Sequence, residues 1–231
     1  LAAMGRISAG IAHEIRNPLA AIAQANALMA EDADTPSQRQ LTQMVSDNVE
    51  RLKRIVDDVM EVAPGGPATT APVIDLTALV GSVCSEWART ARLPLDDRSA
   101  LRVTLPQHPL ATRFDPDHLR RVLVNLLDNA YRHASGNPGS VLVHLYPDGE
   151  DVVTLSVASD GDPIPPDVER YLFEPFFSTR SRGTGLGLYI CKELCERYGA
   201  SIDYRLRGAH HSARNEFFLA MRREALEAPV S

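Results

Sequence analysis

The stretch DPDHLRRVLVNLLDNAYRHA, residues 115–134, predicts a long amphipathic helix. Asp115 is a favourable N-cap residue, and Pro116 suits the first helical position, where a backbone N–H has no partner within the helix. Apolar side chains recur at helical spacing on the face that we expect to be buried: Leu119, Val122, Leu123, Leu126 and Leu127. This helix is therefore expected to cover the core of a domain.

The opposite face of this helix carries polar side chains at positions i, i+4 and i+7, namely Asn125, Asn129 and Arg132. Asparagine is an average-to-poor helix former, so two asparagines at this spacing require an explanation. Carboxamide oxygens are suitable ligands for Mg²⁺, and a guanidinium group suits phosphate. The stripe is therefore either a solvated polar face or a site for a Mg²⁺–triphosphate.

Helices and strands are predicted on both sides of residues 115–134. Helical patterns cover residues 75–90 and 186–199, and the stretch 140–159 reads as a hairpin that turns at PDGE. Short strands are predicted at residues 100–106, 110–114, 201–208 and 214–224. Together these elements predict an α/β sandwich with a mostly antiparallel sheet.

Two long helices are predicted in residues 1–62, separated by EDADTPS, in which Ser37 can cap the second helix. The second helix has a seam with strict 4-3 spacing: Leu41, Val45, Asn48, Leu52, Ile55, Val59 and Val62. Asn48 either sets the register of this seam or is a tolerated imperfection. Because a lone hairpin cannot bury both apolar faces, we expect two copies to form a four-helix bundle.

The Pro/Gly/Ala/Thr-rich stretch APGGPATTAP marks a domain boundary. We expect a helical domain at 1–62, a linker at 63–73, an α/β domain at 74–224 and a tail at 225–231.

The first helix contains GIAHEIRNPLAAI, residues 10–22. His13 is two residues from both Ile11 and Ile15, about 200° around the helix, so it is expected to face away from their apolar stripe. Pro18 lacks the N–H that would bond the carbonyl of Glu14. An exposed imidazole beside a carboxylate is a workable nucleophile, although an ordinary solvated histidine fits the same pattern.

The glycines Gly183, Gly185 and Gly187 alternate in FEPFFSTRSRGTGLGLYI, residues 173–190, just before a predicted helix. Glycines let backbone N–H groups approach phosphates, and a helix N-terminus favours anions. A GxGxG pattern alone also fits a flexible loop.

Composition limits the class of protein. The 231 residues carry a net charge of −6, so nothing suggests direct nucleic-acid binding. The sequence shows neither a membrane-spanning run nor a signal peptide, and its abrupt start suggests a piece of a longer protein. Three cysteines without a CxxC pair are expected to be reduced thiols of a cytosolic protein.

Four motifs in order resemble those of bacterial two-component sensor histidine kinases. HEIRNPL resembles their H-box, NLLDNAYRHA the N-box of the GHKL ATPase superfamily, FEPFF the F-box and GTGLGL the G2-box. The resemblance implies a dimeric four-helix bundle of helical hairpins, the HisKA domain, followed by an α/β sandwich with the GHKL, or Bergerat, ATP-binding fold.

The resemblance also implies residue roles. His13 would be the phospho-acceptor, Glu14 its general base, and Asn17 the residue that orients water during dephosphorylation of a partner. Asn129 would bind Mg²⁺ with Asn125 alongside it, and Arg132 would contact phosphate. The glycine-rich loop and its lid would bind the nucleotide through Thr179, Arg180, Arg182, Gly183, Thr184, Gly185, Leu186 and Gly187.

One motif departs from the family pattern. The G1-box usually reads D-x-G-x-G-I, whereas this chain has ASDGDPIPP, residues 158–166. Anchoring on Gly161 places Ser159 where the adenine-binding Asp belongs. Either the loop shifts and Asp160 serves adenine, or Ser159 accepts the bond as a neutral group. The second case would cost about 1 kcal/mol, near fivefold in affinity.

The resemblance implies an enzyme that uses ATP and Mg²⁺ to phosphorylate His13 and then transfers the phosphoryl group to an Asp of a separate response regulator. An alternative is a phosphatase-dominant or scaffold module with weak ATP binding. GHKL ATPases of the chaperone or topoisomerase type lack an H-box and have a glutamate base where Asn125 stands. We expect a homodimer, a cytoplasmic location for this part, and a membrane only through an upstream region.

Overall fold

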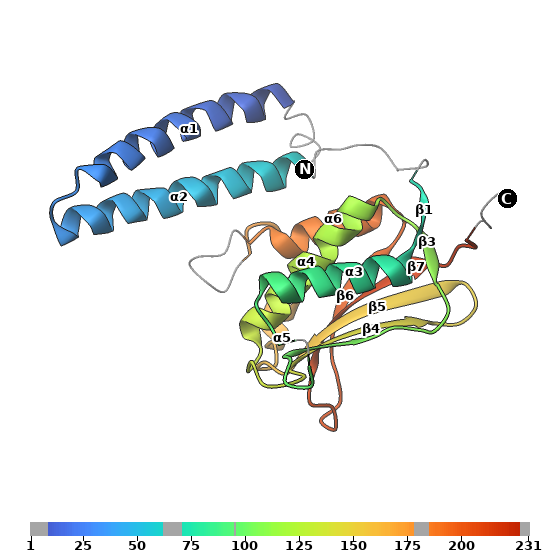
Figure 1. Cartoon of the computed structure of the whole chain (residues 1–231). Coiled ribbons are helices and arrows are strands. Elements are labelled where there is room, and N and C mark those ends of the chain that lie inside the picture. Colours follow the sequence, from blue (N-terminus) through green and yellow to red (C-terminus); the bar gives the residue numbers. More distant parts are fainter. Residues whose placement is uncertain (1–8, 62–70, 95, 178–184, 227–231) are drawn as a thin grey trace. The chain divides into compact units, whose positions relative to one another are not determined.

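The fold is described from a computed structural model (Figure 1). The structure describes residues 9–61, 71–94, 96–177 and 185–226, without the side chains of residues 9–14, 54 and 58–61. The chain divides into two units, residues 1–65 with 175–187, and residues 66–174 with 188–231.

A helical hairpin begins the chain, with α1 (Ala9–Glu31) and α2 (Pro36–Glu61). The turn before α2 is a capping box. The Thr35 hydroxyl accepts a bond from the Gln38 N–H at 3.2 Å, and the Gln38 side chain accepts one from the Thr35 N–H at 2.9 Å. The prediction that Ser37 caps α2 is therefore wrong, because Pro36 already occupies the first helical position and leaves Thr35 as the cap.

The two helices of the hairpin bury a narrow seam. The side chains buried in it are Leu19, Asn26, Thr42 and Val49. Asn26 donates to the Thr42 carbonyl across the hairpin at 2.8 Å. Three residues of the predicted 4-3 seam of α2 are exposed on the hairpin: Leu41 is 59%, Val45 is 40% and Leu52 is 47% exposed. Ile55 is half-buried, and the side chains of Val59 and Val62 lie outside the described residues. Apolar rows therefore remain uncovered on a single chain.

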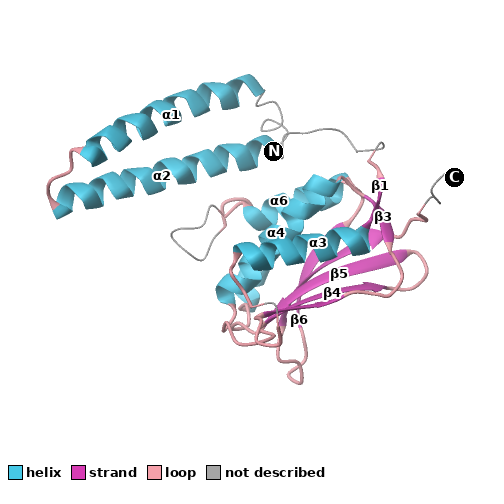
Figure 2. Cartoon of the chain, viewed as in Figure 1, coloured by secondary structure: helices cyan, strands magenta, loops and turns pink. Residues whose placement is uncertain are grey.

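The second unit contains the α/β sandwich (Figure 2). In chain order its elements are β1 (Val73–Asp75), α3 (Leu76–Thr90), β2 (Leu101–Thr104), β3 (Ala111–Arg113), α4 (Pro116–His133), β4 (Val141–Pro147), β5 (Val152–Ser159), α5 (Pro166–Glu169), α6 (Gly187–Arg197, from Leu188 in this unit), β6 (Ser201–Leu206) and β7 (Asn215–Arg222). The main sheet has the order β2-β4-β5-β7-β6, and β1 pairs with β3. Only the β2–β4 pair of the main sheet is parallel, which confirms the predicted, mostly antiparallel sandwich.

The core of the sandwich lies between the helices and one face of the sheet. The apolar face of α4 supplies Leu119, Val122, Leu123, Leu126 and Leu127, each at most 1% exposed. The Asp115 side chain accepts from the backbone N–H groups of Asp117 and His118, which confirms the predicted N-cap. The apolar pattern of residues 115–134 therefore correctly predicted which face of α4 is buried.

All three cysteine thiols are free and buried. Burial raises the pKa of Cys84 and of Cys191 to about 12, and it raises the pKa of Cys195 well above its ordinary value. Cys191 also donates to the Val122 carbonyl at 3.8 Å. These thiols act as small core side chains.

Candidate functional site

The polar stripe of α4 is open to a ligand. Asn125 and Asn129 are half-buried, and Arg132 is exposed near the end of the helix. No described residue forms a hydrogen bond or an ion pair with these three side chains. Carboxamides on a helix that have no partner among the described residues can coordinate a metal ion or donate to a bound anion.

The rotation of α4 is set by its contacts with α3. Trp87 donates from its indole nitrogen to the Asp128 carboxylate at 2.8 Å, and its ring packs edge-on against Tyr131 with centroids 5.5 Å apart. Arg120 of α4 also forms an ion pair with Glu86 of α3. Because Asp128 adjoins Asn129 in sequence, the contact with Trp87 also fixes the direction in which the Asn129 side chain leaves the helix.

The loop after β5 packs against the C-terminal end of α4. The Asp160 carboxylate accepts two bonds from Ser135, from the backbone N–H at 2.9 Å and from the hydroxyl at 2.6 Å. Gly161 approaches so closely that a Cβ there would lie 2.4 Å from the His133 carbonyl oxygen. The structure thus brings the predicted adenine loop to the end of the helix that carries Asn129 and Arg132.

Ser159 is the last residue of β5 and is 5% exposed. It lies opposite Val141 on β4 and Asn215 on β7, so the sheet holds its backbone on both sides. Ser159 is therefore fixed by the sheet, whereas Asp160 is fixed by its side-chain bonds to Ser135.

The glycine-rich loop is described only from Gly185 onward. Thr179, Arg180, Arg182, Gly183 and Thr184 lie outside the described residues. Gly185 has a φ of 69°, and a Cβ there would lie 2.5 Å from the carbonyl carbon of Phe176. Leu186 is 1% exposed, and α6 begins at Gly187. Backbone contact with the FEPFF segment therefore explains why glycine is required at position 185.

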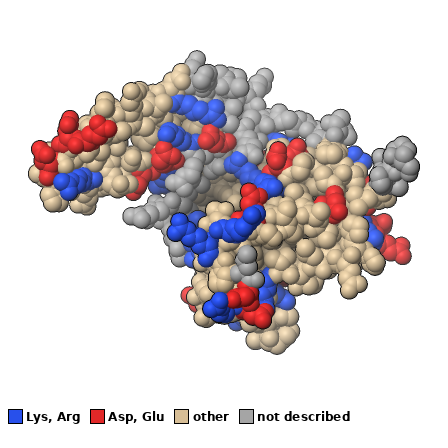
Figure 3. All heavy atoms as spheres, in the orientation of Figure 1, with Lys and Arg blue, Asp and Glu red and all other residues tan. Residues whose placement is uncertain are grey.

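The H-box lies in α1, which continues through Pro18. His13 and Glu14 belong to this helix, but their side chains are outside the described set. Asn17 is exposed, and Arg16 pairs across the hairpin with Asp57 through contacts of 2.6 and 3.1 Å. Figure 3 shows acidic and basic side chains close together on this hairpin. The ion pair ties the two helices together near the H-box.

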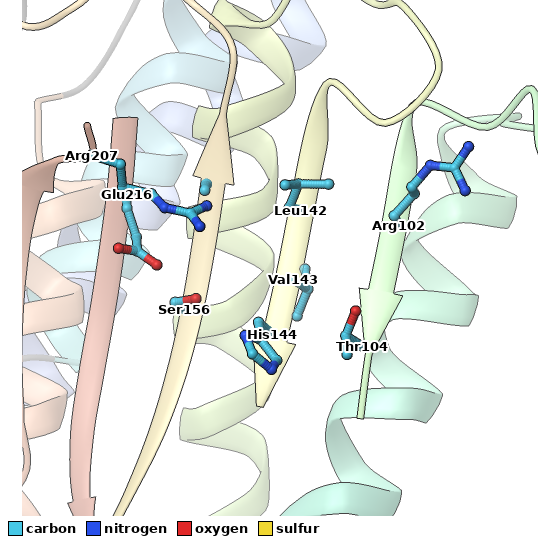
Figure 4. A pocket seen from close by; sticks show the side chains of 9 residues that line it. Arg102, Thr104, Leu142, Val143, His144, Ser156, Arg207 and Glu216 are labelled. Atoms are coloured by element: carbon cyan, nitrogen blue, oxygen red, sulfur yellow. The ribbon is translucent and has the colours of Figure 1, made fainter. Parts of the chain in front are cut away.

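A separate hollow of about 180 Å³ lies on the sheet face away from the helices (Figure 4). Its charged lining comes from Arg102, Arg207 and Glu216. Arg102 pairs with Asp97, and Glu216 pairs with Arg205. None of the predicted nucleotide-binding residues lines this hollow, and its charges already have protein partners.

No group of three or more His, Cys, Asp and Glu side chains among the described residues is arranged to hold a metal ion. No helix among these residues has the length and apolarity needed to cross a membrane.

The chain matches two family models. Residues 3–66 match the His Kinase A (phospho-acceptor) domain, and residues 114–222 match the histidine kinase-, DNA gyrase B- and HSP90-like ATPase domain. The arrangement of a helical hairpin followed by this ATPase fold defines the class. The chain belongs to the two-component sensor histidine kinases, of which it represents the catalytic core.

Curated relatives agree with this assignment. Sensor protein kinase PilS of Pseudomonas aeruginosa is 40% identical over 212 residues, covering 90% of this chain and 39% of that protein. Sensor histidine kinase ZraS of Salmonella typhimurium is 33% identical, covering 89% of this chain and 43% of that protein. The chain thus spans about two fifths of the length of these relatives.

A solved structure supports the fold. Full-length ShkA, determined in complex with AMPPNP, has a TM-score of 0.69 at 24% identity, covering 96% of this chain and 46% of that one.

Sequence reasoning missed two residues that shape the site. Ser135 donates hydrogen bonds to the Asp160 carboxylate, and Asn215 hydrogen-bonds to the loop that follows Asp160. The only signal for Asn215 was an amide at the start of the apolar strand NEFFLAM, where a buried polar group needs a partner.

Proposed function

We propose that this chain is an ATP-dependent protein-histidine kinase that phosphorylates His13. The observation that carries the proposal is the stripe of Asn125, Asn129 and Arg132, which has no side-chain partner among the described residues and lies on α4 beside the loop of Gly161. Among the GHKL folds, the match of residues 3–66 to a phospho-acceptor domain favours a kinase over a chaperone or topoisomerase ATPase.

The reaction is a phosphoryl transfer. A ring nitrogen of His13 attacks the γ-phosphorus of ATP, the new N–P bond forms, and the bond from that phosphorus to the β-γ bridging oxygen breaks, so that ADP leaves. Glu14, next to His13 in α1, accepts the imidazole proton. The protein contributes mainly positioning and charge neutralisation, with Arg132, Arg180 and Arg182 as the phosphate contacts.

The residues of α4 fit a Mg²⁺ ion. Asn129 would supply a carboxamide oxygen, with Asn125 alongside, and the remaining ligands would be phosphate oxygens and water. When bound, the ion would neutralise the charge of the triphosphate. Both side chains are half-buried and have no partner within the part of the chain that the structure describes, as expected for ligands of a group that binds later.

Ser159 is the proposed adenine contact. The alternative, Asp160, has both carboxylate oxygens engaged with Ser135 at 2.9 and 2.6 Å. A neutral hydroxyl in place of a carboxylate weakens the bond to the adenine amino group, so ATP binding is expected to be modest. The glycine-rich residues Gly183, Thr184, Gly185, Leu186 and Gly187 complete the proposed nucleotide site.

The phosphoryl group is proposed to pass to an Asp of a separate response regulator in the cytoplasm. Asn17, exposed on α1 one turn from His13, is proposed to orient water for the phosphatase reaction, in which water removes the phosphoryl group from the response regulator. The proposed domains are residues 1–62 for phosphotransfer and 74–224 for ATP binding, joined by the linker 63–73, with a tail at 225–231.

The hairpin is proposed to dimerise through its exposed apolar rows. These rows contain Ile15, Ile22 and Met29 on α1 and Leu41, Val45 and Leu52 on α2, all 40–66% exposed. A second copy of the hairpin would cover them in a four-helix bundle.

Replacing Leu52 with glutamate is expected to weaken the dimer more than about 100-fold. A twofold axis places two copies of the charge in the interface, and each buried leucine contributes about 1.5–3 kcal/mol. Sedimentation velocity of the whole chain would measure the shift to monomer. The control is Gln24→Glu, which places a charge at an exposed position of α1 outside these rows. This variant is expected to remain dimeric. A Leu52→Glu chain that stays dimeric would contradict the proposed interface.

Gly161→Ala is expected to weaken Mg²⁺–ATP binding about tenfold or more. The added Cβ would lie 2.4 Å from the His133 carbonyl oxygen, a backbone atom, so the loop must move away from α4. Isothermal titration with Mg²⁺–ATP measures the change. The control is Gly81→Ala in α3, whose Cβ would meet only the flexible end of Leu105 at 3.3 Å. Unchanged affinity in Gly161→Ala would show that the loop does not contact nucleotide.

The function is tested by incubating the chain with γ-labelled ATP and Mg²⁺. We expect a label that is labile in acid and stable in base, as a phosphohistidine is. Removal of Mg²⁺ with a chelator is expected to abolish the label. If the folded, dimeric chain acquires no label, the proposal of a kinase is wrong, and the phosphatase or scaffold module becomes the favoured function.

A further inference from the structure

Asn215 connects the sheet to the loop that follows Ser159. It is the first residue of β7, is 5% exposed, and lies opposite Ser159 in the β5–β7 pair. Its side-chain nitrogen donates to the carbonyls of Gly161 at 2.7 Å and of Asp162 at 3.1 Å. Its side-chain oxygen accepts from the Ile164 N–H at 3.3 Å. One buried amide thus binds three residues of this loop.

The Asn215 side chain is itself held by Tyr204 on β6. The tyrosine hydroxyl donates to the amide oxygen of Asn215 at 2.8 Å, and the tyrosine is 5% exposed. Its ring packs on Phe217 with centroids 5.2 Å apart. Burial raises the pKa of Tyr204, so this hydroxyl stays protonated and remains a donor. The orientation of the Asn215 amide is therefore set before any ligand binds.

The loop has few other means of holding its shape. Pro163 and Pro165 carry no backbone N–H, so Ile164 supplies the only amide donor between Asp162 and Pro166. That donor bonds to Asn215. The second glycine of the family's G1 pattern is also missing, because Pro163 stands in its place. Hydrogen bonds from the Asn215 side chain on β7 thus hold this loop where few backbone N–H groups are available within it.

We propose that Asn215, oriented by Tyr204, is a positioning residue that fixes the loop of Gly161–Ile164 and thereby sets the affinity for nucleotide. The inference rests on the proposed binding of ATP beside Gly161. Asn215 acts through the loop rather than by touching the ligand. Loss of its bonds is expected to let the loop leave α4, which raises the dissociation constant without unfolding the domain.

Two substitutions separate the bonds. Asn215→Leu removes all of them at similar size. Asn215→Asp keeps the acceptor for Tyr204 and Ile164 but places an oxygen against the carbonyls of Gly161 and Asp162, where a donor is needed. The matched control is Thr112→Val, which removes a buried bond of 2.8 Å to the Arg222 carbonyl at a different point of the domain.

Two measurements on the whole chain test the proposal. Amide hydrogen exchange reports the loop at Ile164, and isothermal titration reports the dissociation constant for Mg²⁺–ATP. We expect both Asn215 variants to raise that constant about tenfold and Asn215→Leu to speed exchange at Ile164, while Thr112→Val changes neither. Thermal melting followed by the fluorescence of Trp87 confirms that each variant is folded. A reversibly unfolded fraction raises the apparent dissociation constant by the reciprocal of the folded fraction, so a chain that is at least half folded accounts for at most about a twofold change.

The outcomes are distinct. Faster exchange with an unchanged dissociation constant, or unchanged exchange at Ile164 in Asn215→Leu, overturns the positioning role. An equal loss of affinity in Thr112→Val also overturns it, because the effect would then be general. Absence of ATP binding by the unmodified chain refutes the proposed function instead. In that case the exchange measurement still decides whether Asn215 holds the loop.

Discussion

His13→Gln is expected to abolish the acid-labile label from γ-labelled ATP, because glutamine has no nucleophilic nitrogen to attack phosphorus. His13 follows an alanine and precedes Glu14 in α1, within the residues that match the phospho-acceptor model. Glutamine is a good helix former, so the substitution removes the imidazole while the helix is preserved. The label is measured on the purified dimer by filter binding after alkaline treatment.

The control for His13→Gln is the same change at His108, an exposed histidine between β2 and β3. Its labelling is expected to equal that of the unmodified chain. ATP binding by His13→Gln is expected to be unchanged in titration, because the acceptor is not part of the proposed nucleotide site. Acid-labile label that persists on His13→Gln would place the acceptor at another histidine.

Asn129→Ala is expected to lower the rate of autophosphorylation at least about 100-fold. The substitution removes a carboxamide oxygen that is proposed to bind Mg²⁺, and loss of even a residue that supports a metal ligand costs about 10–100-fold. Asn129 is half-buried and forms no side-chain bond with any described residue, so its truncation breaks no bond among those residues. Alanine is also a better helix former, so α4 is expected to remain intact.

The matched control for Asn129→Ala is Asp128→Asn, at the adjacent position of α4. Asp128 accepts from Trp87 at 2.8 Å, and the asparagine oxygen can still accept this bond. Asp128→Asn is expected to label at a normal rate over a titration of Mg²⁺. Equal rates of autophosphorylation in Asn129→Ala and the unmodified chain at limiting Mg²⁺ would contradict the proposal that Asn129 binds Mg²⁺.

The elements that were predictable are those encoded over short distances. The face of α4, its cap at Asp115 and the hairpin at residues 140–159 follow from periodicity and turn residues. The H-, N-, F- and G2-box residues were likewise proposed from short motifs that resemble those of a known family. The prediction of the α2 cap was wrong although it also concerned a short stretch. Thr35 and Ser37 are both good cap residues, and Pro36 at the first helical position leaves Thr35 as the cap.

The parts that could not be predicted depend on which distant groups meet. The sequence alone left Ser159 and Asp160 equally open for adenine. The contact of Asp160 with Ser135, 25 residues away, is what engages its carboxylate and favours Ser159. The role proposed for Asn215 likewise depends on strand order, since β7 must lie beside β5 for its amide to reach Gly161.

The sequence by itself therefore determined the class of fold, the family and the residues available for chemistry. Helical periodicity, caps and short motifs act within a few residues, and each is readable without a partner. Only the tertiary structure decided which polar side chains have a hydrogen-bond partner among the described residues and which, like Asn129, have none there. That distinction depends on pairings between residues far apart in the chain, because a buried polar group takes whichever partner the packed elements place within hydrogen-bond distance.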